Sequence, residues 1–230
     1  FMAKLFSRRA ILAQIALGTG AATVGLPVQH AFAARDDRPW AFFTNDEARW
    51  MAAVVDVFIP QDEFPSASQA GVVDFIDYQM ATAYGAGKGL YLEPPFPDGA
   101  VAEQGYQLEF TPAQLLRQGI EQARQLGDFA TMDATARADH VEELSNRDDF
   151  IGTLIAELWK LTRQGYFADP IYLGNHDYAG WRMVGFPGAH AYYTERVDEH
   201  ERSVTPPPRG IAHDRGGSPY PPRAIGGGSD

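Results

Sequence analysis

The stretch GYFADPIYLGNHDYAGWRMVGFPG, residues 165–188, differs in composition from the rest of the chain. It holds six aromatic residues, five glycines and two prolines. Glycine permits positive φ and close backbone approach, proline fixes φ, and aromatic side chains supply large contact areas at low entropic cost. The stretch therefore predicts a loop of fixed shape without a regular hydrogen-bond ladder. It would serve either as a cap over the preceding helices or as a surface that faces a partner.

The residues before this motif predict helices. Capping boxes at Thr44 and Thr111 begin helices that end before Pro60 and near residue 126, after a polar-aromatic linker at residues 35–43. Apolar spacing predicts further helices at residues 66–84, 131–144 and 148–164, the last being the strongest and ending at Gly165. Residues 85–110 are rich in glycine and proline and predict an irregular loop. No strand pattern is convincing, so the fold class is all-α: a single irregular helical domain over residues 34–202 with long Gly/Pro/aromatic loops.

Two pairs of polar side chains on these helices invite a functional interpretation, and a structural one is favoured for each pair. Asp74 and Asp77 lie three residues apart, but the predicted helix turns both toward solvent, so a solvated face is the simpler explanation. His140 and Glu143 lie one helical turn apart, which is half of a carboxylate–histidine metal site. Because the second half is absent, the pattern favours a surface histidine.

The motif also resembles a known family. The runs Gly165-Tyr-Phe-Ala-Asp-Pro170, Tyr172-Leu-Gly-Asn175, Gly180-Trp181 and Gly185-Phe-Pro-Gly188 are similar to the signature of the gluconate 2-dehydrogenase subunit 3 family, over residues 44–188. That family usually has glycine at the position of Leu173. The resemblance implies a non-catalytic small subunit of a flavin-dependent sugar or polyol dehydrogenase. Its partners would be an FAD-containing large subunit of the glucose–methanol–choline oxidoreductase type and a membrane-anchored multihaem c-type cytochrome.

Residues 1–33 predict a targeting segment. Arg8 and Arg9 precede a moderately apolar stretch, and Ala31 and Ala33 flank a small-x-small cleavage site, which favours a twin-arginine signal over an ordinary secretory signal. The twin-arginine system exports folded proteins, so a partner that acquires its cofactor in the cytoplasm could cross with this chain. The resemblance implies the same. The expected location is the periplasm, with attachment to the inner membrane only through the complex.

Composition excludes several classes of function. Removing the three basic residues of the targeting segment from the chain's 19 leaves 16 basic against 30 acidic residues, a net charge of −14 over residues 34–230. Such a charge repels phosphate backbones, so nucleic-acid binding is excluded. The sequence holds no cysteine, so no thiolate can hold zinc, an iron–sulfur cluster or covalent haem. No cofactor is expected in this chain, and no run of eighteen apolar residues predicts a membrane span.

The C-terminal residues give weaker signals. Residues 191–201 predict a short helix, whereas residues 203–230 are too rich in proline and glycine to form a core. This tail is expected to be disordered alone or to lie in extended polyproline form along a partner.

No catalytic triad, nucleotide-binding loop or complete metal-ligand set is visible in the sequence. The alternative to a subunit is a stand-alone metal-binding protein or enzyme that uses His176 and Asp177, with His140 as a third ligand. For the subunit, the candidate residues lie in the motif, where large aromatic side chains most often supply interface energy. The partner-binding candidates are Tyr166, Phe167, Asp169, Pro170, Tyr172, Gly174, Asn175, Trp181, Phe186 and Pro187. The substrate itself cannot be inferred from this chain.

Overall fold

The structure is a computed structural model that describes residues 39–90, 92–96, 106, 108–129, 131–190, 198, 200–201 and 206–211. The predicted signal at residues 1–33, most of the predicted helix at 191–201 and most of the tail lie outside this part of the chain. Within it, six α-helices and two short 3-10 turns form the fold, and no β-strand occurs there. The all-α prediction is confirmed. None of the helices described is long and apolar enough to cross a lipid bilayer.

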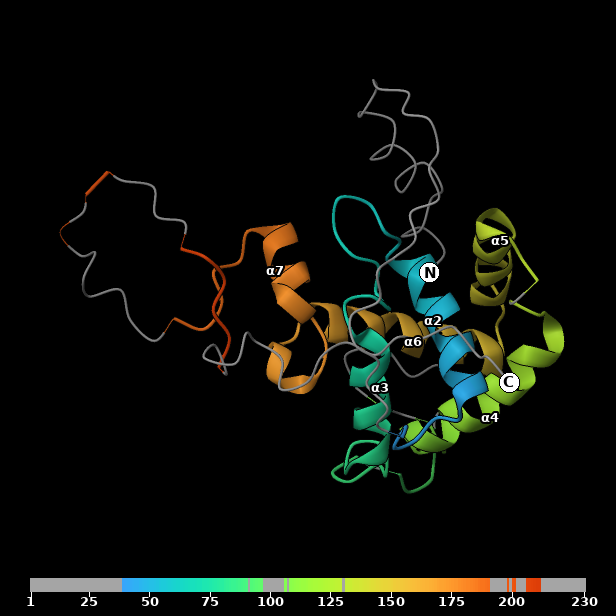
Figure 1. Cartoon of the computed structure of the whole chain (residues 1–230). Helices are drawn as coiled ribbons and strands as arrows, with labels where there is room; N and C mark the ends of the chain where they lie inside the picture. The colour runs from blue at the N-terminus through green and yellow to red at the C-terminus, as the bar shows by residue number, and fades with distance from the viewer. Residues whose placement is uncertain are drawn as a thin grey trace. The chain divides into compact units, whose positions relative to one another are not determined.

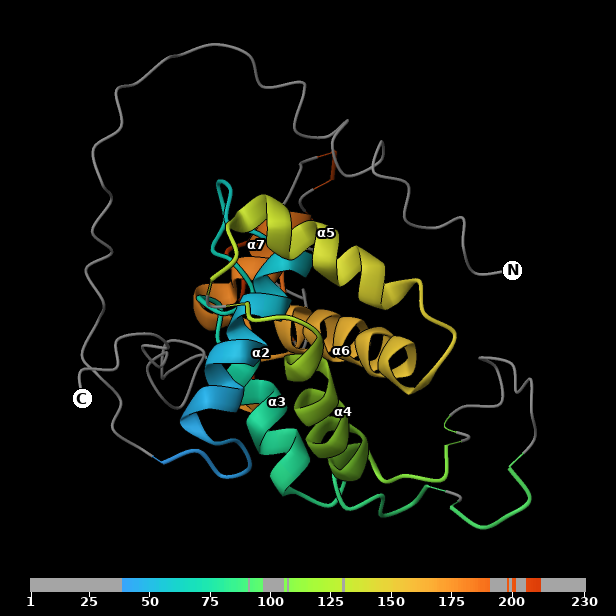
Figure 2. The ribbon, with the colours of Figure 1, turned by 90° about the vertical axis from the view of Figure 1, so that its right-hand side faces the viewer.

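The central helix is α6 (Phe150–Phe167), which contacts each of the other five helices (Figures 1 and 2). These are α2 (Asn45–Phe58), α3 (Val72–Ala81), α4 (Pro112–Leu126), α5 (Ala134–Ser145) and α7 (Ala179–Val184). Asp149 caps the N-terminus of α6 by accepting hydrogen bonds from the N–H groups of Ile151 and Gly152. The apolar stripe of α6 is therefore the surface on which the core forms.

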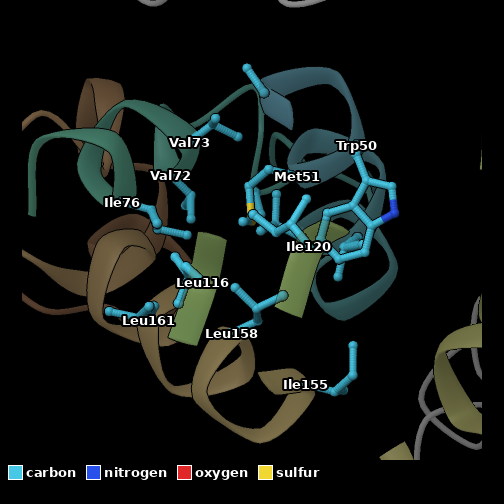
Figure 3. Packing of buried hydrophobic residues seen from close by; sticks show 14 of the residues in the cluster. Trp50, Met51, Val72, Val73, Ile76, Leu116, Ile120, Ile155, Leu158 and Leu161 are labelled. Atoms are coloured by element: carbon cyan, nitrogen blue, oxygen red, sulfur yellow. The ribbon is translucent and has the colours of Figure 1, made fainter. Parts of the chain in front are cut away.

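Side chains from four helices meet in this core. Figure 3 shows Met51 of α2, Val72 and Ile76 of α3, and Leu116 of α4 directed toward Leu158 on α6. All five are fully buried. At about 1.5–3 kcal/mol for each side chain of this size, their burial is a major contribution to the free energy of folding.

Both predicted capping boxes are present. Thr44 accepts from the N–H of Glu47 while the Glu47 carboxylate accepts from the N–H of Thr44, and Thr111 and Gln114 make the same reciprocal pair. Glu47 also accepts a hydrogen bond from Arg117 on α4. Burial alone would raise the pKa of Glu47, but the hydrogen bonds from Arg117 and Thr44 together outweigh it and lower that pKa. One carboxylate therefore both caps α2 and joins it to α4.

Three helix boundaries differ from the prediction. Helix α3 begins at Val72 rather than residue 66, because Gly71 adopts a left-handed conformation (φ 82°) that interrupts the preceding turns. Helix α5 begins after Asp133, whose carboxylate accepts from the N–H of Ala136. Helix α6 continues through Gly165 to Phe167: a Cβ at Gly165 would lie 2.8 Å from Cδ1 of Phe75, so this glycine allows close packing instead of ending the helix.

The prediction that Asp74 and Asp77 face solvent is wrong, because both are buried. The Asp77 carboxylate accepts hydrogen bonds from the N–H groups of Ala41, Phe42 and Phe43, each at 2.9 Å. The linker before α2 therefore folds onto α3 and covers this face of the helix. The interpretation of His140 as a surface residue is also wrong, since its ring packs against Phe129 at 5.3 Å between centroids.

Candidate functional site

The motif at residues 165–188 begins inside the last turn of α6 and wraps around the end of that helix. Tyr166 is fully buried, and its hydroxyl donates a 2.7 Å hydrogen bond to the carbonyl of Pro65, 101 residues earlier in the chain. Burial, with a smaller contribution from the carboxylate of Asp62, raises the pKa of Tyr166 to about 12. The hydroxyl therefore stays neutral and keeps donating at physiological pH.

Asn175 joins the end of α6 to the start of α7. Its side chain is fully buried; its amide nitrogen donates to the carbonyl of Ala168 and its amide oxygen accepts from the N–H of Gly180, both at 2.8 Å. The residue itself adopts a left-handed conformation, with φ of 52°. Asparagine tolerates this region better than most residues, so it suits both requirements of the position.

Two glycines let the motif approach the backbone of α6 closely. A Cβ at Gly174 would lie 2.2 Å from the carbonyl oxygen of Gly165, and a Cβ at Gly180 would lie 2.1 Å from that of Tyr166. Neither position could hold a larger residue without displacing backbone atoms. The prediction of an entirely irregular loop is wrong after residue 178, since residues 179–184 form α7.

Trp181 is the centre of an aromatic cluster. It is buried and donates from Nε1 to the carbonyl of Phe167 at 2.7 Å. Tyr178 stacks on one side of it at 5.4 Å, and the ring of Phe186 meets it edge-on at 5.1 Å. In the isolated chain Trp181 is thus a packing residue that fixes α7 against α6. Of the two roles predicted for the motif, a cap over the helices or a surface facing a partner, this residue performs the first.

The outer side of the motif is apolar and exposed. Eight large hydrophobic side chains are exposed in the described part of the chain. Two of them, Tyr78 and Leu126, lie elsewhere, and the rest belong to the motif or to residues 206–211, a segment that lies against the motif. The six others are Phe167, Ile171, Tyr172, Val184, Phe186 and Ile211. We call these six the apolar face. Clustering of this kind is typical of a surface that another protein covers.

The predicted partner-binding residues divide between the two sides of the motif. Phe167, Tyr172 and Phe186 belong to the apolar face, whereas Asp169 and Pro187 are half-buried. The buried members, which support the motif from inside, are Tyr166, Pro170, Gly174, Asn175 and Trp181. Sequence reasoning missed Ile171, Val184 and Ile211. An isolated large aliphatic residue within a glycine- or proline-rich stretch was the only signal for them.

The structure does not bring the proposed metal ligands together. His176 is buried with its ring over Gly71, and its backbone N–H donates to the carbonyl of Ala70 at 3.0 Å. Its neighbour Asp177 is exposed, and His140 lies on α5, with Nδ1 3.8 Å from a carboxylate oxygen of Glu143. No three side chains of types that bind metals converge anywhere in the described residues. The described residues therefore contain no assembled site for the alternative function, a stand-alone metal-binding protein or enzyme.

A family model described as gluconate 2-dehydrogenase subunit 3 matches residues 45–188. The chain belongs to the gluconate 2-dehydrogenase subunit 3 family. The match begins at the first residue of α2 and ends at Gly188, so it includes all six helices and the whole motif. Membership makes the chain one subunit of a multi-subunit gluconate dehydrogenase complex. Searches of curated proteins and of solved structures gave no significant match.

Leu173 occupies a position where this family usually has glycine, and its backbone explains that preference. Its φ is 79°, in the left-handed region that favours glycine. We expect Leu173→Gly to be more stable than Leu173→Ala by about 1 kcal/mol, because alanine keeps the steric penalty that glycine relieves. Urea unfolding of both variants measures the difference.

Leu126, in the last turn of α4, is the matched control for that comparison. There the order reverses, and Leu126→Ala should be more stable than Leu126→Gly by up to about 1 kcal/mol. The same order of stability at both positions would contradict the assignment of strain to Leu173.

Proposed function

We propose that this chain is the non-catalytic small subunit of a periplasmic, FAD-dependent gluconate, sugar, polyol or glycoside dehydrogenase. It binds the FAD-containing large subunit of the glucose–methanol–choline oxidoreductase type, stabilises it and accompanies it through the twin-arginine translocon. Electrons from the flavin pass to a multihaem c-type cytochrome subunit, which attaches the complex to the inner membrane. FAD and haem belong to those partners.

The observation that carries this proposal is the apolar face on the family motif. Five exposed hydrophobic side chains of the motif, with Ile211 of the adjoining segment, make up this face in a chain whose net charge is −11. Residues 163–190 and 206–211 contain only three basic and two acidic residues, so this region lacks the acidic excess of the rest of the chain. Interface cores are depleted of charge and enriched in aromatic residues, as this face is. The buried hydrogen bonds of Asn175 and Trp181 hold its shape before a partner arrives.

The export role rests on Arg8 and Arg9 in the predicted signal. We expect Arg8→Lys with Arg9→Lys to leave both this chain and its flavoprotein partner in the cytoplasm, because the translocon reads the arginine pair. The measurement is the flavin absorbance and subunit composition of material purified from the periplasm through a tag on this chain. The matched control is Arg35→Lys with Arg38→Lys, which changes the same residue types beyond the predicted cleavage site.

Wild-type chain that purifies from the periplasm with a yellow flavoprotein supports the subunit role. A colourless wild-type chain without a partner contradicts it. If the arginine variant still brings the flavoprotein into the periplasm, the partner has its own route and the export role is wrong, while the docking role stands.

A further inference from the structure

Residues 206–211, which lie outside the family match, form an extended segment against the motif (Figure 1). Arg209 and Gly188 form an isolated parallel β-bridge. The N–H of Arg209 donates to the carbonyl of Pro187 at 3.1 Å, and its carbonyl accepts from the N–H of Ala189 at 2.6 Å. The edge of a β-sheet binds an extended peptide through the same backbone pairing, and here only one pair of residues takes part.

The next two residues of the segment bind side chains of the motif. The N–H of Gly210 donates to the hydroxyl of Tyr178 at 3.1 Å, and the N–H of Ile211 donates to Oδ2 of Asp169 at 2.7 Å. Three consecutive residues of the segment therefore have hydrogen-bonded backbone groups, and their partners are supplied by the motif and by Ala189, which directly follows it. Such a run of bonds fixes both the register and the direction of the segment.

Asp169 brings two exposed isoleucines together. Its Oδ1 accepts from the N–H of Ile171 at 3.0 Å while its Oδ2 accepts from the N–H of Ile211. Because one carboxylate holds both backbones, the two residues are neighbours although 40 positions separate them in the sequence. Tyr172, also exposed, follows directly and donates its N–H to the carbonyl of Asp169.

The side chain of Ile211 faces away from the protein although its backbone is held. It is 64% exposed, more than any other large hydrophobic residue in the described part of the chain. Ordering a segment costs conformational entropy, and burial of an apolar side chain is the usual compensation. In the isolated chain Ile211 provides little of this compensation, so a surface that covers its side chain would stabilise the ordered segment further.

We propose that residues 206–211 act as an intramolecular ligand of the motif and complete the surface that docks the flavoprotein subunit, with Ile171, Tyr172 and Ile211 as its contact cluster. This inference rests on the proposed function, since the occupant is the partner that must stay bound during folded export. A second copy of this chain is the less suitable occupant, because two chains of net charge −11 repel each other.

The first experiment tests the segment in the full chain without its partner. Trypsin cleavage after Arg209 should be slower than cleavage after Arg223, because the bonds on both sides of Arg209 restrict access to the peptide. Tyr178→Phe keeps the stacked ring but removes the acceptor for Gly210, and should speed cleavage after Arg209 by about fivefold. Tyr78→Phe on α3 removes an exposed hydroxyl and should leave the rate unchanged. Equal rates after Arg209 in the Tyr178→Phe and wild-type chains would overturn the proposal.

The second experiment tests docking in the co-expressed complex. Ile211→Ser should raise the dissociation constant for the flavoprotein by about tenfold or more, as truncation of an interface anchor does. Leu126→Ser on α4 is the control, since it removes an exposed hydrophobic side chain away from the motif. If both variants retain the flavoprotein as wild type does, this inference is wrong and the proposed function survives. A wild-type chain that binds no flavoprotein contradicts both, and a wild-type homodimer that Ile211→Ser dissociates assigns the face to a second copy.

Discussion

Asn175→Ala is expected to lower the free energy of unfolding by about 3–7 kcal/mol. The substitution leaves the carbonyl of Ala168 and the N–H of Gly180 without their buried partner, at about 1–3 kcal/mol for each group. It also places alanine at a φ of 52°, which costs about 1 kcal/mol more. The midpoint and slope of urea unfolding, followed by circular dichroism, give the change.

Asp177→Ala separates the two contributions. Asp177 has the same φ of 52°, but its side chain is exposed. We therefore expect a loss of only about 1 kcal/mol from the left-handed backbone. If the two variants are destabilised equally, the buried hydrogen bonds of Asn175 contribute nothing beyond backbone strain and the role assigned to this side chain is wrong.

Those helix features that depend on neighbouring residues could be predicted from the sequence. The capping boxes at Thr44 and Thr111 each require only four residues, and both form as expected. Features that depend on distant residues could not. Gly165 looks like a helix end until Phe75, 90 positions earlier, is seen to pack against it. Composition alone does not contain that contact.

In the candidate site, too, local features could be predicted from the sequence and features that depend on distant residues could not. The density of aromatic residues and glycines identified the motif, and the family match extends to its last residue, Gly188. Which side chains point inward depends on acceptors that no local pattern reveals, such as the carbonyl of Phe167 for Trp181 and that of Pro65 for Tyr166. Ile211 joins the apolar face through backbone bonds of residues 209–211, including the one to Asp169, that no local pattern predicts.

The motif combines both interpretations that its composition left open. Its inner side caps α6 through Asn175 and Trp181, and its outer side presents the apolar face. The two roles support each other, because a docking surface loses less entropy on binding when its backbone is already fixed. Substitutions on the inner side should therefore lower stability first, whereas those on the outer side should lower affinity with little effect on stability.

Asp77→Ala is expected to destabilise the chain by about 3 kcal/mol or more. The effect arises where α3 holds the linker before α2, far from the motif in sequence. The buried carboxylate accepts from three consecutive backbone N–H groups, at Ala41, Phe42 and Phe43. Hydrogen bonds to a charged group are worth about 1.5–3 kcal/mol each, and removal of the carboxylate recovers part of this through its lost desolvation penalty. The loss also releases Phe43 from the core and the Phe42 carbonyl from Arg117.

Tyr78→Ala, at the next position on α3, is the matched control because it removes a larger but exposed side chain. We expect it to change the free energy of unfolding by no more than about 0.5 kcal/mol. Hydrogen exchange distinguishes the mechanism: in Asp77→Ala the amides of residues 41–43 should lose protection first, because they have lost their acceptor while the helix amides keep theirs. If those amides stay protected in Asp77→Ala, the linker is held by its aromatic packing against the core, and the carboxylate has no anchoring role.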